Sequence, residues 1–222
     1  MGEIAHKDDY DRFVGNPDNL CMVSFPRTGS HWLRMLLEVY TERPVLPMTF
    51  HWPGSKNYLF FPTHDIDLKA ERRNVLYLYR NPVETIYSQM GYYSEDTTDE
   101  TRIRHWADLY GRHLDKWLFQ EKFTQKKFVI RYESLKYDAS NAFSRLCSNY
   151  GFQFDVAKFT GVLSRITKEL VQEKAAHDPK VMNLTEGYSK TRGSFSDQYS
   201  GMIWESLLNG RAHVIGAFST KP

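Results

Sequence analysis

Short apolar runs alternate along this chain with longer segments whose apolar residues recur every three or four positions. The short runs predict buried strands at residues 20–25, 74–79 and 127–132, with a further short strand near 58–61. The longer segments predict helices over residues 32–40, 81–90, 101–123, 139–150, 155–175 and 198–209. Because strands alternate with helices, the pattern predicts an α/β fold with a mostly parallel central sheet flanked by helices.

The 222 residues predict a single domain, 1–222, with enough apolar side chains to bury a core. Residues 1–18 are polar and are expected to be a lead-in to the first strand. Residues 43–61 and 178–196 have no regular period and are expected to be long loops. Loops of this length in compact domains are often functional.

The formal net charge is only +2, and no long basic stretch is present, so nucleic-acid binding is not expected. The two cysteines, Cys21 and Cys147, lie in apolar segments and are typical of core thiols in a reducing compartment. No signal-peptide pattern, membrane-spanning run or zinc-binding spacing occurs. These features predict a cytoplasmic protein that requires no metal.

The break between the first strand and the first helix is the first candidate binding site. It reads Pro26-Arg27-Thr28-Gly29-Ser30. Gly29 permits close approach of the backbone, Arg27 supplies a permanent charge, and the hydroxyls of Thr28 and Ser30 are donors. Because the following helix presents free N–H groups, the segment predicts an anion site, with phosphate as the expected ligand. A Walker A sequence is absent, which argues against an ordinary ATPase or kinase.

The segment Phe25-Pro26-Arg27-Thr28-Gly29-Ser30-His31-Trp32 resembles the 5′-phosphosulfate loop of sulfotransferases that use 3′-phosphoadenosine-5′-phosphosulfate (PAPS). The resemblance implies a P-loop-like, three-layer fold in which residues 19–40 form the phosphosulfate loop and its helix. It implies that this loop holds the 5′-phosphosulfate through Arg27, Thr28, Gly29, Ser30 and His31. It also implies a catalytic role for Arg27. Trp32 would lie against the adenine. Arg27 and His31 stand where the family usually has Lys and Thr.

A second match lies at residues 74–90. Arg80 ends a predicted strand, and Asn81, Pro82 and Glu84 are typical of a capped helix start. Sulfotransferases bind the 3′-phosphate of PAPS with such an Arg and with a Ser eight residues later. Ser88 has that spacing here, so the resemblance implies that Arg80 and Ser88 hold the 3′-phosphate.

His64 is the candidate general base. Its segment, Phe61-Pro62-Thr63-His64-Asp65, resembles the Lys-Thr-His segment of cytosolic sulfotransferases, whose His accepts the acceptor's proton. Imidazole suits this task because it titrates near neutral pH. Pro62 replaces the family's Lys, which removes one positive charge. Asp65 is an alternative base or an orienting group, and His31, His51 and His105 are further alternatives.

Two weaker matches complete the predicted cofactor site. Tyr132 resembles the family's adenine-side Tyr, and stacking beside a base is physically reasonable for such a residue. Arg192 and Gly193 match part of the loop that closes over the 3′-phosphate, although Thr191, Ser196 and Gln198 depart from it. Lys180 or Lys190 could supply the charge missing at Pro62.

The resemblance implies in-line sulfuryl transfer from PAPS to an acceptor hydroxyl, with adenosine 3′,5′-bisphosphate as product. A nucleotide-dependent phosphotransferase and a non-catalytic PAPS-binding or bisphosphate-binding module remain alternatives. The acceptor is a glycan, a lipid alcohol or a phenol, and Trp52, Tyr58, Tyr92 and Tyr93 are candidates to stack on it. The sequence leaves the oligomeric state open.

Overall fold

The computed structural model describes residues 7–46, 50, 55–175, 178, 180–181 and 187–219. Its strands form one sheet in the order β2-β1-β3-β4, and every neighbouring pair is parallel. The strand bounds are Cys21–Ser24 for β1, Phe61–Thr63 for β2, Asn74–Tyr79 for β3 and Lys126–Arg131 for β4. The α/β fold and the parallel central sheet predicted from the sequence are therefore confirmed.

Alternate residues of the central strands face opposite sides of the sheet. On one side, the cluster of buried side chains includes Cys21, Val23, Val75, Tyr77 and Tyr79. On the other side it includes Met22, Leu76, Leu78 and Ile130. Because both faces are covered, the strands read as continuous apolar runs, as expected of a buried parallel sheet. The two clusters give the fold its three layers.

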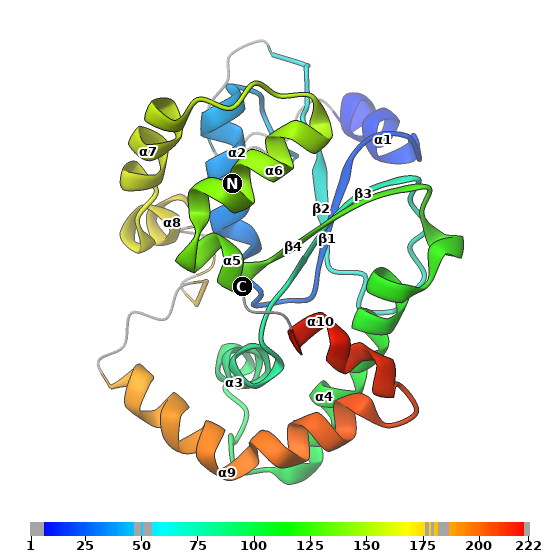
Figure 1. Cartoon of the computed structure of the whole chain (residues 1–222), viewed down its shortest axis with the longest axis vertical. Helices are drawn as coiled ribbons and strands as arrows, with labels where there is room; N and C mark the ends of the chain where they lie inside the picture. Colours follow the sequence, from blue (N-terminus) through cyan, green and yellow to red (C-terminus); the bar gives the residue numbers. More distant parts are fainter. Residues whose placement is uncertain are drawn as a thin grey trace.

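Helices cover both faces of this sheet. Figure 1 shows α2, α6 and α7 on one side of the strands and α1 on the other, with α3 and α9 grouped beyond the ends to which the strands point. The helices are α1 (Lys7–Gly15), α2 (Ser30–Thr41), α3 (Pro82–Tyr93), α4 (Glu100–Leu114), α5 (Tyr132–Tyr137), α6 (Ala139–Tyr150), α7 (Val156–Arg165), α8 (Lys168–Lys174), α9 (Tyr188–Leu208) and α10 (Gly216–Ser219). A π-helix, Asp115–Phe119, continues α4, and two 3₁₀-helices lie at Glu121–Phe123 and Ala212–Ile215. None of the helices in the described part of the chain is long and apolar enough to cross a lipid bilayer.

Several boundaries differ from the sequence-based expectation. The helix expected over 155–175 is two helices, because the chain turns at Ile166 and the Thr167 side chain caps α8. The polar lead-in contains α1, and α3 runs past Gly91. The helix α6 agrees with its prediction, and Gly151 ends it in the left-handed conformation.

The strand register places the segments that follow all four strands at one edge of the sheet. Val23 pairs with Thr63, Ser24 with Leu78, and Tyr79 with Arg131. The residues that follow these strand ends therefore leave the sheet side by side. Ligands bind at this carboxyl edge in open α/β sheets, so the fold brings the candidate site residues together.

Gly111 allows α4 and α9 to pack closely. A Cβ atom added there would lie 2.3 Å from the Leu207 carbonyl oxygen, which is backbone and cannot rotate away. We expect Gly111→Ala to lower the free energy of unfolding by about 1–3 kcal/mol, the usual range for overpacking. Chemical denaturation measures the change.

Gly161 provides the matched control within α7, where an added Cβ meets no described atom within 4 Å. Gly161→Ala should raise stability by roughly 0.5–1 kcal/mol, because alanine is the better helix former. Equal effects of the two substitutions would contradict the close packing of α4 against α9.

Candidate active site

The loop between β1 and α2 turns through two left-handed residues. Arg27 has φ 69° and Gly29 has φ 95°. The left-handed conformation is unfavourable for Arg and easy for Gly, so the surrounding contacts must hold Arg27 in place. The Thr28 hydroxyl donates to the Phe25 carbonyl at 2.8 Å, so it braces the loop rather than facing outward. Gly29 is the N-cap of α2 and has no side chain, which leaves the first N–H groups of the helix open for an anion.

Gly29 also lies directly against an aromatic ring. A Cβ atom at this position would approach the Tyr132 ring to 2.5 Å, so any larger residue must displace the ring. Trp32, in the first turn of α2, meets Tyr132 edge to face with ring centroids 5.9 Å apart. The structure therefore brings together both residues predicted to lie beside the adenine. Ser30 and His31 occupy the same helix turn.

The Arg27 side chain extends from the loop to α3. Its Nε donates to Ser88 Oγ at 3.1 Å, and its Nη2 donates to the carbonyl oxygens of Lys180 and Val181 at 3.0 and 2.9 Å. The guanidinium also lies over the Tyr92 ring. Burial lowers the pKa of Arg27 from its ordinary value, but a guanidinium remains charged at neutral pH. Arg27 and Ser88, from two separate motifs, are thus in direct contact.

Arg80 follows β3 and lies at the centre of a charged cluster. Its Nη1 donates to the Arg27 carbonyl at 3.3 Å, and its guanidinium lies 4.5 Å from the centre of the Tyr132 ring. Its Nε donates to Glu84 Oε2 at 3.2 Å, and its Nη2 reaches the same oxygen. Burial alone would lower the pKa of Arg80, but the Glu84 carboxylate outweighs it and raises that pKa above its ordinary value.

Glu84 links Arg80 to a third arginine. Its other oxygen, Oε1, lies 3.5 Å from Nη1 of Arg192 on α9. Burial would raise the pKa of Glu84, but Arg80, followed by Arg192 and Lys136, holds that pKa below its usual range. In the sequence, Glu84 stands out only as a helix-capping residue. Its position in the first turn of α3, four residues after Arg80, was the available signal.

The helix that carries Ser88 begins as the sequence predicts. The Asn81 side chain accepts hydrogen bonds from the N–H groups of Val83 and Glu84. The N–H of Asn81 itself donates to Glu133 Oε1 at 2.8 Å. A carboxylate at a helix N-terminus is favourable because of the helix dipole.

The expected irregular segment over 178–196 is wrong from Tyr188 onward, because α9 begins there. Phe195, Tyr199, Ile203 and Leu207 repeat at helical spacing and are buried, which explains the helix. Arg192 points to Glu84 and joins the cluster. Gly193 is exposed, and no described atom lies within 4 Å of an added Cβ there, so the structure does not bring it to the cluster.

His64 lies beside the end of β1. Its Nδ1 is 2.8 Å from the Ser24 carbonyl oxygen, which can only accept, so Nδ1 carries the proton and Nε2 keeps its lone pair. Desolvation by nearby atoms lowers the pKa of His64, the bond to Ser24 opposes this, and the charges of Arg34 and Arg27 lower it further. His64 is exposed to solvent, which moderates these effects. A neutral imidazole with an available nitrogen can accept a proton.

The other candidate bases differ from His64. The Asp65 carboxylate accepts from the Ala70 N–H, the Trp117 indole and Lys116, so its oxygens are bonded away from the His64 imidazole and are buried from a substrate. His31 is half-buried, and burial, with Arg34, His64 and Arg27, lowers its pKa to about 3. His105 is exposed and packs on Trp106. His51 and Trp52 lie outside the described residues.

Of the two lysines expected to supply the missing charge, Lys180 lies beside Arg27, because its carbonyl oxygen accepts from Arg27 Nη2 at 3.0 Å. Pro62 pairs with Met22 inside the sheet. The Lys180 ammonium contacts the Tyr92 carbonyl and Ser94 Oγ at the C-terminal end of α3, and Lys190 is exposed on α9. Among the described residues, no three His, Cys, Asp or Glu side chains are grouped so that they could hold a metal ion.

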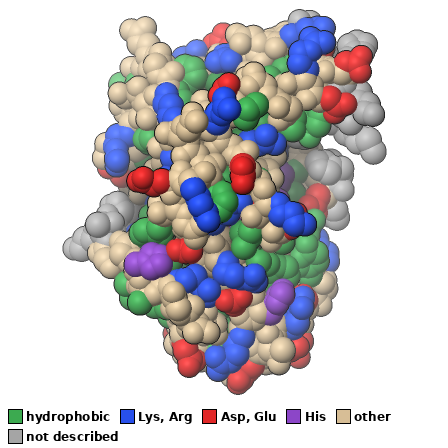
Figure 2. All heavy atoms as spheres, turned by 90° about the vertical axis from the view of Figure 1, so that its right-hand side faces the viewer, with side chains coloured by type: hydrophobic (Ala, Val, Ile, Leu, Met, Phe, Trp, Pro, Cys, Tyr) green, Lys and Arg blue, Asp and Glu red, His purple; other side chains and the backbone are tan. Residues whose placement is uncertain are grey.

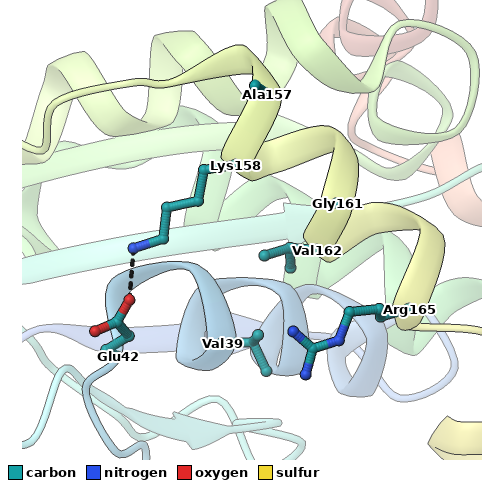
Figure 3. Close-up of a pocket in the computed structure, with 7 residues that line it drawn as sticks. All are labelled: Val39, Glu42, Ala157, Lys158, Gly161, Val162 and Arg165. Atoms are coloured by element: carbon teal, nitrogen blue, oxygen red, sulfur yellow. Dashed lines mark hydrogen bonds and ion pairs between the residues drawn. The ribbon is translucent and has the colours of Figure 1, made fainter.

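A surface cavity of about 390 Å³ lies away from this cluster (Figure 3). It lies between the C-terminal end of α2, with Val39 and Glu42, and α7, with Lys158 and Arg165. The loop of residues 26–30 is at the opposite end of α2, so this cavity is not part of the candidate site. On the face drawn in Figure 2, Lys and Arg side chains are scattered among Asp and Glu side chains.

Solved structures with the same fold include two proteins whose crystals contain PAP, which is adenosine 3′,5′-bisphosphate. Mouse sulfotransferase SULT7A1, complexed with PAP, matches with a TM-score of 0.57 and 14% identity over 95% of this chain and 92% of its own. Retinol dehydratase, in complex with androsterone and inactive cofactor PAP, matches with a TM-score of 0.57 and 11% identity over 97% and 86% of the two chains. At these identities the likeness establishes the fold.

A curated relative is the cytosolic sulfotransferase 16 of Arabidopsis thaliana, which is 22% identical over 206 residues. The match covers 71% of this chain and 60% of the relative, so the chain spans about three fifths of the relative's length. The model of the sulfotransferase domain family matches residues 56–209, more than half of the chain. That range contains His64, Arg80, Ser88 and Tyr132, whereas the loop with Arg27 precedes it. The chain belongs to the sulfotransferase domain family.

Proposed function

We propose that this chain transfers a sulfuryl group from PAPS to an acceptor hydroxyl, with His64 as the general base. The observation that carries the proposal is the convergence of Arg27, Arg80, Arg192 and Ser88 at the carboxyl edge of the sheet. These residues come from three separate segments, and the charges of the three arginines suit the two phosphate groups of a nucleotide. Membership of the sulfotransferase domain family supports the same activity.

The residues at this edge fit PAPS. Arg80, Ser88 and Arg192 would hold the 3′-phosphate. Trp32 and Tyr132, in edge-to-face contact, would lie beside the adenine. The 5′-phosphosulfate would bind the loop of Arg27, Thr28, Gly29, Ser30 and His31, where Gly29 leaves no room for a Cβ atom against Tyr132. Thr28 would contribute its N–H, because its hydroxyl is bonded to Phe25.

When bound, PAPS supplies the sulfuryl group that passes in line to the acceptor oxygen and leaves adenosine 3′,5′-bisphosphate. His64 Nε2 accepts the proton of the acceptor hydroxyl, while Nδ1 stays on the Ser24 carbonyl and fixes the ring. The Arg27 guanidinium stabilises negative charge at the donor phosphate. Catalysis would come mainly from positioning and charge stabilisation, as in phosphoryl transfer.

The acceptor carries a hydroxyl group. The classes to test are a glycan, a lipid alcohol and a phenol. Tyr93 is 56% exposed and stacks parallel to Trp106 with centroids 5.7 Å apart, which offers a flat apolar surface to a ring. Cytoplasmic location is part of the proposal. It is supported by two free, buried cysteines and by the cytosolic sulfotransferase among the relatives.

Arg80→Ala should weaken the binding of adenosine 3′,5′-bisphosphate by about 10- to 100-fold, because charge-assisted hydrogen bonds contribute about 1.5–3 kcal/mol each. Titration calorimetry measures the change, with Arg104→Ala as control because Arg104 pairs with Glu205 at the surface. Wild type should prefer the bisphosphate to ATP with Mg²⁺. A preference for ATP would favour the phosphotransferase alternative.

His64→Asn should lower turnover by about 10²- to 10⁴-fold, the usual contribution of a general base, with bisphosphate affinity unchanged. Asn keeps a donor for the Ser24 carbonyl but removes the basic Nε2. Turnover is measured with PAPS and a panel of phenol, steroid alcohol and sugar acceptors. Near-normal turnover of the variant would refute the assigned base, and bisphosphate binding without transfer to any acceptor would favour the non-catalytic alternative.

Turnover should persist below the ordinary histidine pKa of about 6.5, because His64 has a lowered pKa and acts in its neutral form. The acid limb of the kcat/KM profile should therefore titrate below that value. An acid limb clearly above it would show that the His64 environment differs from the one described.

A further inference from the structure

The loop that carries His64 has an unfavourable backbone. Asp65 has φ 44° and Leu68 has φ 58°, and neither is glycine. The turn is closed by the Leu68 N–H, which donates to the Asp65 carbonyl at 3.0 Å. Left-handed residues of this kind persist only where their surroundings hold them. The conformation of residues 64–70 therefore depends on the contacts around them more than that of an ordinary surface loop does.

Lys116, in the π-helix after α4, donates three hydrogen bonds to this loop. Its Nζ donates to Asp65 Oδ2 at 2.7 Å, to the Leu68 carbonyl at 2.8 Å and to the Ala70 carbonyl at 2.7 Å. The side chains of Lys116 and Asp65 are only 4% and 1% exposed. All three protons of the ammonium are thus used on one short segment. π-Helices occur frequently at functional sites.

The Asp65 carboxylate accepts two further hydrogen bonds. Its Oδ1 accepts from the Ala70 N–H at 2.7 Å, and its Oδ2 also accepts from the Trp117 indole at 2.9 Å. A buried ion pair is favourable only with such geometry and additional hydrogen bonds. Replacing the pair by apolar groups is often neutral for stability, so stability alone does not explain it.

His113 is hydrogen-bonded to the backbone of His64, the candidate general base. Its Nε2 lies 2.9 Å from the His64 carbonyl oxygen, and its Nδ1 lies 2.9 Å from the Tyr77 hydroxyl. Because the carbonyl can only accept, Nε2 carries the proton and Nδ1 accepts from Tyr77. Lys116 and Trp117 follow His113 by three and four residues, so the three side chains lie on one helix face. From this face His113 bonds to the His64 carbonyl, and Lys116 and Trp117 bond to the Asp65 carboxylate.

We propose that His113 and the buried ion pair of Asp65 with Lys116 form a positioning clamp for His64. The clamp fixes the backbone on which the imidazole sits, while the bond to Ser24 fixes the ring. Catalytic groups must be held to within a fraction of an ångström, and a base on a loop lacks the support of a regular element. The inference deepens the proposed function and rests on it for the role of His64.

The first experiment removes the ion pair without leaving a buried charge. The double variant Asp65→Asn, Lys116→Met is compared with Glu42→Gln, Lys158→Met, which removes an exposed pair of the same 2.7 Å length at the far end of α2 (Figure 3). Nitrogen-15 correlation spectra report the His64 tautomer, and hydrogen exchange reports the amides of residues 65–70. Calorimetry with adenosine 3′,5′-bisphosphate shows that the cofactor site is intact.

The clamp variant should lose the single Nδ1–H tautomer of His64 and exchange the loop amides at least tenfold faster. Its turnover with the acceptor panel should fall at least tenfold, while the bisphosphate Kd stays within twofold of wild type. The control pair should change none of these. A clamp variant with the wild-type tautomer and wild-type exchange would overturn the inference.

A second comparison covers the case in which the double variant does not fold. His113→Gln keeps an N–H donor near the position of Nε2, whereas His113→Phe keeps the ring size without the donor. Loss of the His64 tautomer and of turnover in His113→Phe, with recovery in His113→Gln, supports the clamp, and wild-type behaviour of both overturns it. If His64→Asn keeps full turnover, the proposed base is wrong, and the tautomer and exchange data still decide the clamp.

Discussion

The parallel register of the four strands is the constraint on which the site depends. Because β1, β2, β3 and β4 end at the same edge, Arg27, His64, Arg80 and Tyr132 leave the sheet as neighbours although they span more than one hundred residues of sequence. The contact of Gly29 with the Tyr132 ring then sets the separation between the loop after β1 and the segment after β4. A shift of one residue in any strand would send the following side chain to the other face.

Placing three arginines at one edge creates repulsion that the protein offsets with Glu84. Glu84 contacts both Arg80 and Arg192, and Arg27 donates to Ser88 and to backbone carbonyls. The cluster is therefore ordered by acidic and carbonyl oxygens, which are the kind of atom a phosphate would present. In the proposed complex, the phosphate oxygens would meet guanidinium groups that such contacts already hold in place.

Local signals predicted much of this architecture. The apolar runs of β1 and β3, the Asn81 cap of α3 and the Gly151 end of α6 are recorded in short stretches of sequence, and the structure agrees with each. The start of α9 was missed because its polar residues suggested a loop, although Phe195, Tyr199, Ile203 and Leu207 carried the helical period. The pairs of Glu84 with Arg192 and of Asp65 with Lys116 could not be predicted, because they join segments whose distance is set only by the completed fold.

A crystal structure of the complex with adenosine 3′,5′-bisphosphate tests the central claim most directly. The account predicts the 3′-phosphate against Arg80, Ser88 and Arg192, the 5′-phosphate at the first N–H groups of α2, and the adenine beside Trp32 and Tyr132. His64 should lie beside the 5′-phosphate with its Nδ1 still on the Ser24 carbonyl. A nucleotide bound elsewhere, for example in the cavity between α2 and α7, would contradict the account.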